Sequence, residues 1–157
     1  KPRIRWYDKK YNAAKLELKF RDGFNGYKKT YSGFGFSNTP NSVLKLVKKT
    51  SNFLNDFRSL TDLRPSTKVT YQRRYFMHPR GIRATIDIDI YAEPISCDIY
   101  QSRGEIPLGF EVLEIKYIAG HDDYVREYIY PCFIYLSMRL TKCSKYVESV
   151  FSLSNNK

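Results

Sequence analysis

Charged and apolar residues alternate along several short stretches of this chain. In the stretch 112–117, which reads Val-Leu-Glu-Ile-Lys-Tyr, Glu114 and Lys116 alternate with apolar or aromatic neighbours. Successive side chains of a β-strand point to opposite faces, so this pattern predicts a strand with one charged face and one apolar face. Strands of the same kind are predicted at residues 1–8, 13–21, 68–77 and 82–91.

Breaks in the alternation predict how the first strands are connected. Residues 1–8 and 13–21 are separated by a polar break, which predicts an antiparallel hairpin, and residues 27–31 predict a third short strand. From Pro40 to about Leu60 the apolar residues recur at helical spacing, which indicates an amphipathic helix.

The second half of the chain gives weaker patterns. Residues 95–100 predict a further short strand, and residues 122–140 predict a helix that Pro131 interrupts. Residues 142–146 predict a basic turn, and residues 151–157 predict a polar tail.

Many antiparallel strands with few helices predict an α+β protein built on an antiparallel β-barrel or a strongly curved sheet. The charged strand faces could point to the outside, which would leave the helices without apolar surface to cover. Alternatively, they could line a polar, cationic lumen, with the helices packed outside against the apolar faces. The second arrangement is favoured because Tyr and Arg also occupy the lumen positions.

Composition narrows the choice of partner. A chain of 157 residues suits one domain, and no run of 18 apolar residues could span a bilayer. Its 27 Lys and Arg against 16 Asp and Glu give a net charge of +11, which indicates an anionic partner: nucleic acid, a membrane surface or a phosphate-rich molecule. The 3 cysteines form no paired motif, which favours a reducing compartment over a disulfide framework.

The charged face of each strand carries residue types that bind phosphate. Arg offers a planar fork of donors that matches phosphate oxygens, and Lys adds a mobile point charge. The acids on these faces, Glu114 together with Glu17, Asp87 and Asp89, are candidate ligands for a hard divalent ion, because Mg²⁺ takes one or two protein carboxylates and shares its other positions with water and phosphate. An ion pair with a neighbouring Lys is the alternative role for Glu114.

Seven short motifs occur in one order along the chain. They are Lys1-x-Arg3-x-Arg5-x-Tyr7, Glu17-Leu18-Lys19, Lys28-Lys29, Tyr71-x-Arg73, Arg83-Ala84-Thr85-Ile86-Asp87, Leu113-Glu114-Ile115-Lys116-Tyr117 and Ser144-Lys145-Tyr146. Together they resemble the polyphosphate polymerase domain of the vacuolar transporter chaperone (VTC) family, which belongs to the triphosphate tunnel metalloenzymes. The resemblance runs over residues 1 to about 150.

The resemblance implies an antiparallel tunnel barrel in which the γ-phosphate of ATP is transferred to a growing polyphosphate chain with the help of Mn²⁺ or Mg²⁺. It also implies a cytoplasmic location, at the cytoplasmic face of a membrane. Glu114 would hold the metal. Catalytic phosphate ligands would be Arg3, Arg5, Lys19, Arg73, Arg83 and Lys116, and further phosphate-binding groups would be Lys29, Tyr71, Ser144 and Lys145.

One departure from the family pattern changes these expectations. Members of the family begin with a strand that carries Glu and Lys, followed by helices and a Tyr-Phe-Asp strand. None of these is present in this sequence. Residues 1–150 are therefore expected to form a tunnel domain that an upstream segment or a membrane-protein partner completes. The choice between Lys28 and Lys29 stays open, because a one-residue slip turns a strand side chain to the other face.

Three alternatives to the polymerase stay open. One is a non-catalytic module that binds polyphosphate or inositol phosphates, and another is a tunnel triphosphatase, which would need a denser set of glutamates. General nucleic-acid binding would spread the basic residues over an outer surface, whereas the tunnel interpretation predicts no specific nucleic-acid partner.

Overall fold

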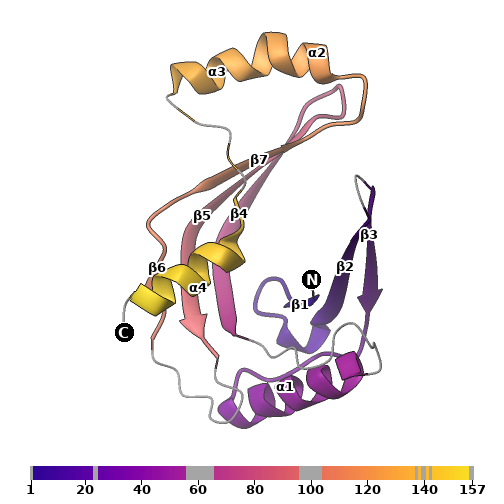
Figure 1. Ribbon diagram of the computed structural model, residues 1–157, viewed down its shortest axis with the longest axis vertical. Coiled ribbons are helices and arrows are strands. Elements are labelled where there is room, and N and C mark those ends of the chain that lie inside the picture. Colours follow the sequence, from indigo (N-terminus) through magenta and orange to yellow (C-terminus); the bar gives the residue numbers. More distant parts are fainter. Residues whose placement is uncertain are drawn as a thin grey trace. The chain divides into compact units, whose positions relative to one another are not determined.

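The structure is a computed structural model that describes residues 2–22, 25–55, 66–95, 104–136, 138, 141 and 143–155 (Figure 1). The chain forms two compact units. The first unit comprises residues 1–66 and 95–102, and the second comprises residues 67–94 and 103–157. Residues 96–100 of the strand predicted at 95–100, and the end of the predicted helix after Asn55, lie outside the described residues.

The first unit is a three-stranded antiparallel sheet followed by a helix. Its strands β1 (Pro2–Arg5), β2 (Lys15–Asp22) and β3 (Asn25–Tyr31) pair in the order β1-β2-β3. A short 3-10 helix, η1 (Tyr11–Ala13), joins β1 to β2, and α1 (Pro40–Asn55) comes after β3. The predicted hairpin, third strand and amphipathic helix are confirmed.

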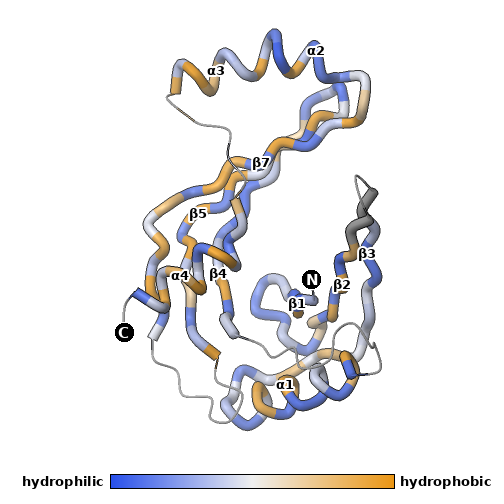
Figure 2. The backbone as a smooth tube through the Cα atoms, in the orientation of Figure 1, coloured by the Kyte–Doolittle hydropathy of each residue, from blue (hydrophilic) through white to orange (hydrophobic). Residues whose placement is uncertain are grey.

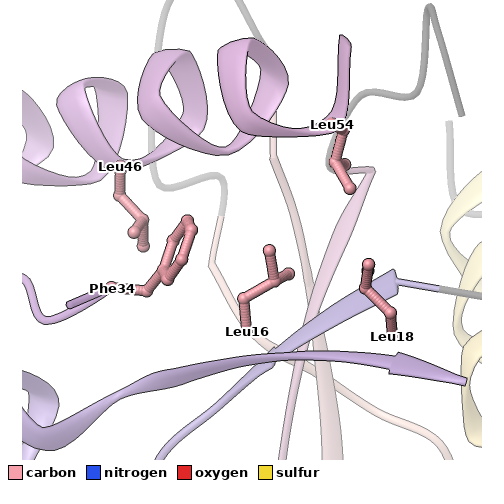
Figure 3. Close-up of a cluster of buried hydrophobic side chains, with 5 residues drawn as sticks. All are labelled: Leu16, Leu18, Phe34, Leu46 and Leu54. Carbon is pink, nitrogen blue, oxygen red and sulfur yellow. The ribbon is translucent and has the colours of Figure 1, made fainter. Parts of the chain in front are cut away.

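Apolar side chains from β2 and α1 form the core of the first unit (Figure 3). Leu16 and Leu18 alternate with charged residues on β2 and meet Leu46 and Leu54 of α1 together with Phe34. All five are buried. The apolar face of this sheet therefore lies under a helix, as the sequence predicts.

The second unit is built on a longer antiparallel sheet. Its strands are β4 (Thr67–Met77), β5 (Arg83–Pro94), β6 (Ile106–Pro107) and β7 (Val112–Lys116). β5 is central, because it pairs with β4 along one edge and with β6 and β7 along the other. Figure 2 shows hydrophilic and hydrophobic residues alternating along these strands. The strands predicted at 68–77, 82–91 and 112–117 are confirmed.

A bulge at Asp89 interrupts the alternation of β5. Gln72 pairs with Ile88, but Thr70 pairs with Tyr91, so β5 carries one extra residue at this point. Asp89 has a φ of 51°, a left-handed conformation that Asp adopts more readily than most residues, and its carboxylate accepts a hydrogen bond from Gln72 Nε2 at 2.9 Å. The prediction that Asp89 shares a face with Asp87 is therefore wrong, because Gln72 lies on the opposite face from the Asp87 partner Arg73.

The region 122–140 is helical and contains an irregular turn. It consists of α2 (Asp122–Tyr124), the π-helical turn η2 (Val125–Ile129) and α3 (Tyr130–Tyr135). Pro131 does not end the helix, because it lies in the first turn of α3, directly after the wide π turn, where a missing N–H costs little.

The C-terminal helix α4 (Lys145–Asn155) corrects two predictions. Residues 145–155 are helical, where the sequence predicts a turn and a polar tail. The helix packs against β4 and β5 on the same face as Asp87, because Lys145 at its start contacts that carboxylate. The helices were predicted to pack against the apolar faces, whereas α4 packs on the charged face. The bulge explains this packing, because the extra residue in β5 changes which side chains face α4. Beyond the bulge, the apolar pair Val69 and Ala92 lies on the same face as Asp87.

The described residues thus form an α+β protein with antiparallel sheets. Neither sheet closes on itself within the described ranges, so the barrel stays a prediction. Among the helices of the described ranges, none is both long and apolar enough to cross a membrane.

Leu16→Ala should destabilise the protein by about 2 to 5 kcal/mol, because truncating a fully buried Leu removes apolar contacts and leaves a cavity. Leu16 is 0% exposed. Urea unfolding would measure the change, with the exposed Ile118→Ala as the control. A loss as small as that of the control would contradict the packing of α1 on β2.

Candidate anion-binding site

The charged face of the second unit gathers side chains from three strands. Cross-strand register pairs Arg73 with Asp87, Thr85 with Glu114, and Arg83 with Lys116. The side chains of such pairs lie on the same face of the sheet. Apart from Asp87, these residues line an open hollow of about 230 Å³, which Tyr75 and Met77 also border.

Asp87 holds two basic side chains on this face. Asp87 is 0% exposed. Its carboxylate accepts a bidentate pair of hydrogen bonds from Arg73, with Nε–Oδ1 at 2.5 Å and Nη2–Oδ2 at 2.7 Å. Lys145 Nζ, from the start of α4, lies 2.5 Å from Oδ2. Asp87 therefore acts as a counter-ion for two predicted phosphate ligands.

These contacts fix the charge of each partner. Burial alone would raise the pKa of the Asp87 carboxyl, but hydrogen bonds from Arg73 and Lys145 outweigh burial and hold that pKa below its usual value. The same bond raises the pKa of the Arg73 guanidinium. Asp87 and Arg73 therefore stay ionised at neutral pH.

Tyr71 extends this cluster on the same face of β4. The Arg73 guanidinium carbon lies 5.3 Å from the centre of the Tyr71 ring, and Lys145 Nζ lies 5.1 Å from it. The structure thus brings together three sequence-predicted site residues from β4 and α4. Ser144 directly precedes Lys145, the first residue of α4, and is half-buried.

Glu114 lies in the hollow but has a basic partner. Its Oε1 is 3.1 Å from Lys116 Nζ, and the side chains are 44% and 59% exposed. Within the described residues, no three Asp, Glu, His or Cys side chains gather into a metal-binding group. Glu114 therefore fits a divalent ion only if substrate phosphates and water supply most of its ligands.

Thr85 is a candidate residue that the sequence interpretation did not assign. Its Oγ1 is buried and has no hydrogen-bond partner in the described part of the chain. Buried hydroxyls usually find a partner, and this one lies beside Arg83 and Glu114 at the hollow. Its position across from Glu114 could be found only once the strand register was known.

The charged face of the first unit is organised in the same way around Glu17. Glu17 is 5% exposed and accepts bonds from Arg3 at 2.6 Å and Lys28 at 3.1 Å, while Arg5 Nη1 lies 3.9 Å away. Burial would raise the pKa of Glu17, but the bonds from Arg3 and Lys28 outweigh it and lower that pKa. Glu17 is thus a second counter-ion for basic side chains.

The register of β2 and β3 decides between the two adjacent lysines. Lys28 pairs with Lys19 and shares the charged face, whereas Lys29 pairs with Leu18 on the apolar face. The assignment of Lys29 to the charged face is therefore wrong, and Lys28 takes that place.

Cations that surround a buried carboxylate suit the binding of anions, and both units show this arrangement. In the second unit an open hollow lies beside it. Residues 1–154 match the VTC domain family, so the chain belongs to that family, which is associated with polyphosphate. Comparison with curated proteins and with solved structures gave no match.

Acid should destabilise the protein through Asp87 and Glu17. Their folded pKa values lie below the unfolded ones, so the unfolded chain takes up protons first as pH falls. Their stabilisation is full above about pH 4, the usual pKa of carboxyls, and is lost as pH falls through the folded pKa values.

Asp87→Asn should flatten this part of the profile of unfolding free energy against pH, measured by urea titration, because it removes one of the two linked groups. The exposed Asp123→Asn is the control and should keep the wild-type slope. An Asp87→Asn profile as steep as the wild-type profile would contradict the role of this carboxylate.

Proposed function

We propose that the charged faces bind polyphosphate and that the protein transfers the γ-phosphate of ATP to a growing polyphosphate chain. The observation that carries the proposal is the cluster of Tyr71, Arg73 and Lys145 around Asp87. These residues come from β4 and α4, and the family resemblance implies that each of them is a phosphate ligand.

The clusters leave donors for a further anion. The bonds from Arg73 to Asp87 use its Nε–H and one Nη2–H, so among the described residues the Nη1 donors beside the hollow have no partner. Arg83 and Lys116 also line this hollow. A phosphate chain would replace the water around these cations with charge-assisted bonds.

Holding the cations in place lowers the cost of binding. A free Arg or Lys side chain loses rotamer entropy when it binds a ligand, whereas Arg73 and Lys145 are already fixed by Asp87. Such preorganised positive charge also suits phosphoryl transfer, which depends mainly on positioning and electrostatic stabilisation.

Within this proposal, the charged faces line the tunnel of an antiparallel barrel, as the family resemblance implies. Arg73, Arg83 and Lys116 would bind and orient the phosphates in line, and the hydroxyls of Tyr71, Thr85 and Ser144 would donate to non-bridging oxygens. Glu114 would help to hold Mn²⁺ or Mg²⁺, which would supply neutralising charge to the reacting phosphates.

A non-catalytic polyphosphate-binding module is the second candidate. The ion pair between Glu114 and Lys116 favours it, because a carboxylate that neutralises a lysine does not need a metal. A tunnel triphosphatase is less well supported, since Glu17 is occupied by basic partners.

Arg83→Gln should weaken the binding of tripolyphosphate by about 1.5 to 3 kcal/mol, the range for a hydrogen bond to a charged group. Isothermal titration at fixed ionic strength would measure it. Arg74→Gln is the matched control. Arg74 pairs with Ile86 on the opposite face of the sheet, so this variant removes the same charge away from the site. If both variants lost the same affinity for tripolyphosphate, net charge alone would explain the loss, and this result would contradict a site at Arg83.

Glu114→Gln distinguishes the enzyme from the binding module. If Glu114 helps to hold the metal, the variant should lose polyphosphate synthesis from ATP and Mn²⁺ while it still binds tripolyphosphate, and Glu111→Gln should keep synthesis. The assay should use the full-length protein.

A wild-type protein that binds polyphosphate but makes none with any divalent metal would favour the binding module. A Glu114→Gln variant with wild-type turnover would exclude a metal role for this residue.

A further inference from the structure

The hollow on the charged face of the second unit has an apolar border beside its cations. Cross-strand register places Tyr75 opposite Thr85 and Met77 opposite Arg83, so both side chains lie on the charged face. Tyr75 is 66% exposed and Met77 is 69% exposed. Neither belongs to the motifs on which the family resemblance rests. The proposed binding of phosphate groups leaves this apolar surface without a role.

The apolar and the basic residues of the hollow come from different strands. Tyr75 and Met77 lie on β4, whereas Arg83 and Lys116 lie on β5 and β7, which run beside it (Figure 1). Neighbouring strands of a sheet are about 4.8 Å apart, so the width from β4 to β7 is roughly 10 Å. The hollow therefore has an apolar side and a cationic side within the reach of one small molecule.

The Tyr75 ring is held in place by the cation cluster next to it. The Arg73 guanidinium carbon lies 5.9 Å from the centre of this ring, within the range of a cation–π contact. Asp87 in turn fixes the guanidinium through two hydrogen bonds. A tyrosine ring has few torsions to restrict when it binds a ligand, and this contact restricts them in advance. The exposed part of the ring is thus a prepared surface for a flat ligand.

These two sides suit a nucleotide better than an inorganic phosphate chain. Polyphosphate carries charged oxygens on every phosphorus, so it makes no favourable contact with a thioether or with the face of an aromatic ring. A nucleobase has a flat face, and stacking on an aromatic side chain strengthens binding about 5- to 150-fold. The hollow of about 230 Å³ is smaller than the roughly 300 to 1,000 Å³ of pockets that enclose a whole ligand, so it suits the nucleoside part of a nucleotide.

We propose that Tyr75 and Met77 form the nucleoside subsite for the ATP that donates the γ-phosphate. The base stacks on the Tyr75 ring beside Met77, and the triphosphate extends towards Arg83 and Lys116. The inference rests on the proposed function and deepens it, because it assigns the residues that distinguish the nucleotide donor from the polyphosphate acceptor. Replacing Tyr75 with Ala leaves the net charge unchanged, so the variant separates base stacking from the attraction that all polyanions share.

The test measures the binding of ATP, tripolyphosphate and ribose triphosphate, which lacks the base, to the full-length protein by isothermal titration at fixed ionic strength. Y75A should bind ATP at least about fivefold more weakly than the wild type, because the base loses its stacking partner. It should bind the two ligands without a base like the wild type. Y75F keeps the ring and should keep the affinity for ATP.

Tyr128 provides the matched control. It is 56% exposed on η2 and does not line the hollow, so Y128A removes a tyrosine of similar exposure and should leave all three affinities unchanged. Y75L keeps apolar bulk without the ring and should lose affinity for ATP like Y75A, and circular dichroism would check that each variant is folded. The fluorescence of an aminopurine nucleoside triphosphate, which is quenched when the base stacks, should fall with the wild type and Y75F but not with Y75A.

The outcomes separate this inference from the function on which it rests. A wild-type protein that binds neither ATP nor tripolyphosphate would overturn the proposed function itself. A wild type that binds tripolyphosphate, but binds ATP no more tightly than ribose triphosphate, would overturn the nucleoside subsite and leave the phosphate site intact. An equal loss of ATP and tripolyphosphate affinity in Y75A would also overturn the subsite, since Tyr75 would then act only through the position of Arg73.

Discussion

A buried carboxylate in each unit fixes the basic side chains of its charged face. Asp87 and Glu17 each lie almost fully out of water and accept bonds from two or more cations. A buried carboxylate without partners would be costly, so the cations must stay close to it. The same contacts keep like-charged side chains at defined positions, where they would otherwise repel one another. The carboxylates therefore link the stability of the fold to the chemistry of its surface.

The alternation of strand residues sets which side chains can join these clusters. In the first unit it divides cleanly, with the apolar face under α1 and the charged face around Glu17. In the second unit the bulge at Asp89 inverts the pattern partway along β5. Before the bulge, Arg83 and Asp87 lie on the charged face. After the bulge, the apolar Ala92 lies on this face, which α4 covers. One inserted residue thus lets a helix bring Lys145 to a carboxylate on the charged face.

Most strands could be predicted from the sequence because each alternates over several residues, and α1 because its apolar residues repeat at helical spacing. The bulge could not be predicted, since Asp89 continues the alternation in the sequence. α4 was not predicted because its polar end was interpreted as a tail, although Tyr146, Val147, Val150 and Phe151 recur at helical spacing. The basic residues of the site were predicted by type, but the roles of Glu17 and Asp87 depend on which cations face them across the strands. The choice of Lys28 over Lys29 likewise depends on register, which the sequence leaves open by one residue.

The central claim is that these preorganised cations bind phosphate groups. A crystal structure of the protein with tripolyphosphate tests it most directly. The account predicts phosphate oxygens within hydrogen-bond distance of Arg73, Arg83 and Lys116, with Asp87 still bonded to Arg73 and Lys145. Tripolyphosphate bound away from these residues, at saturating concentration, would contradict it.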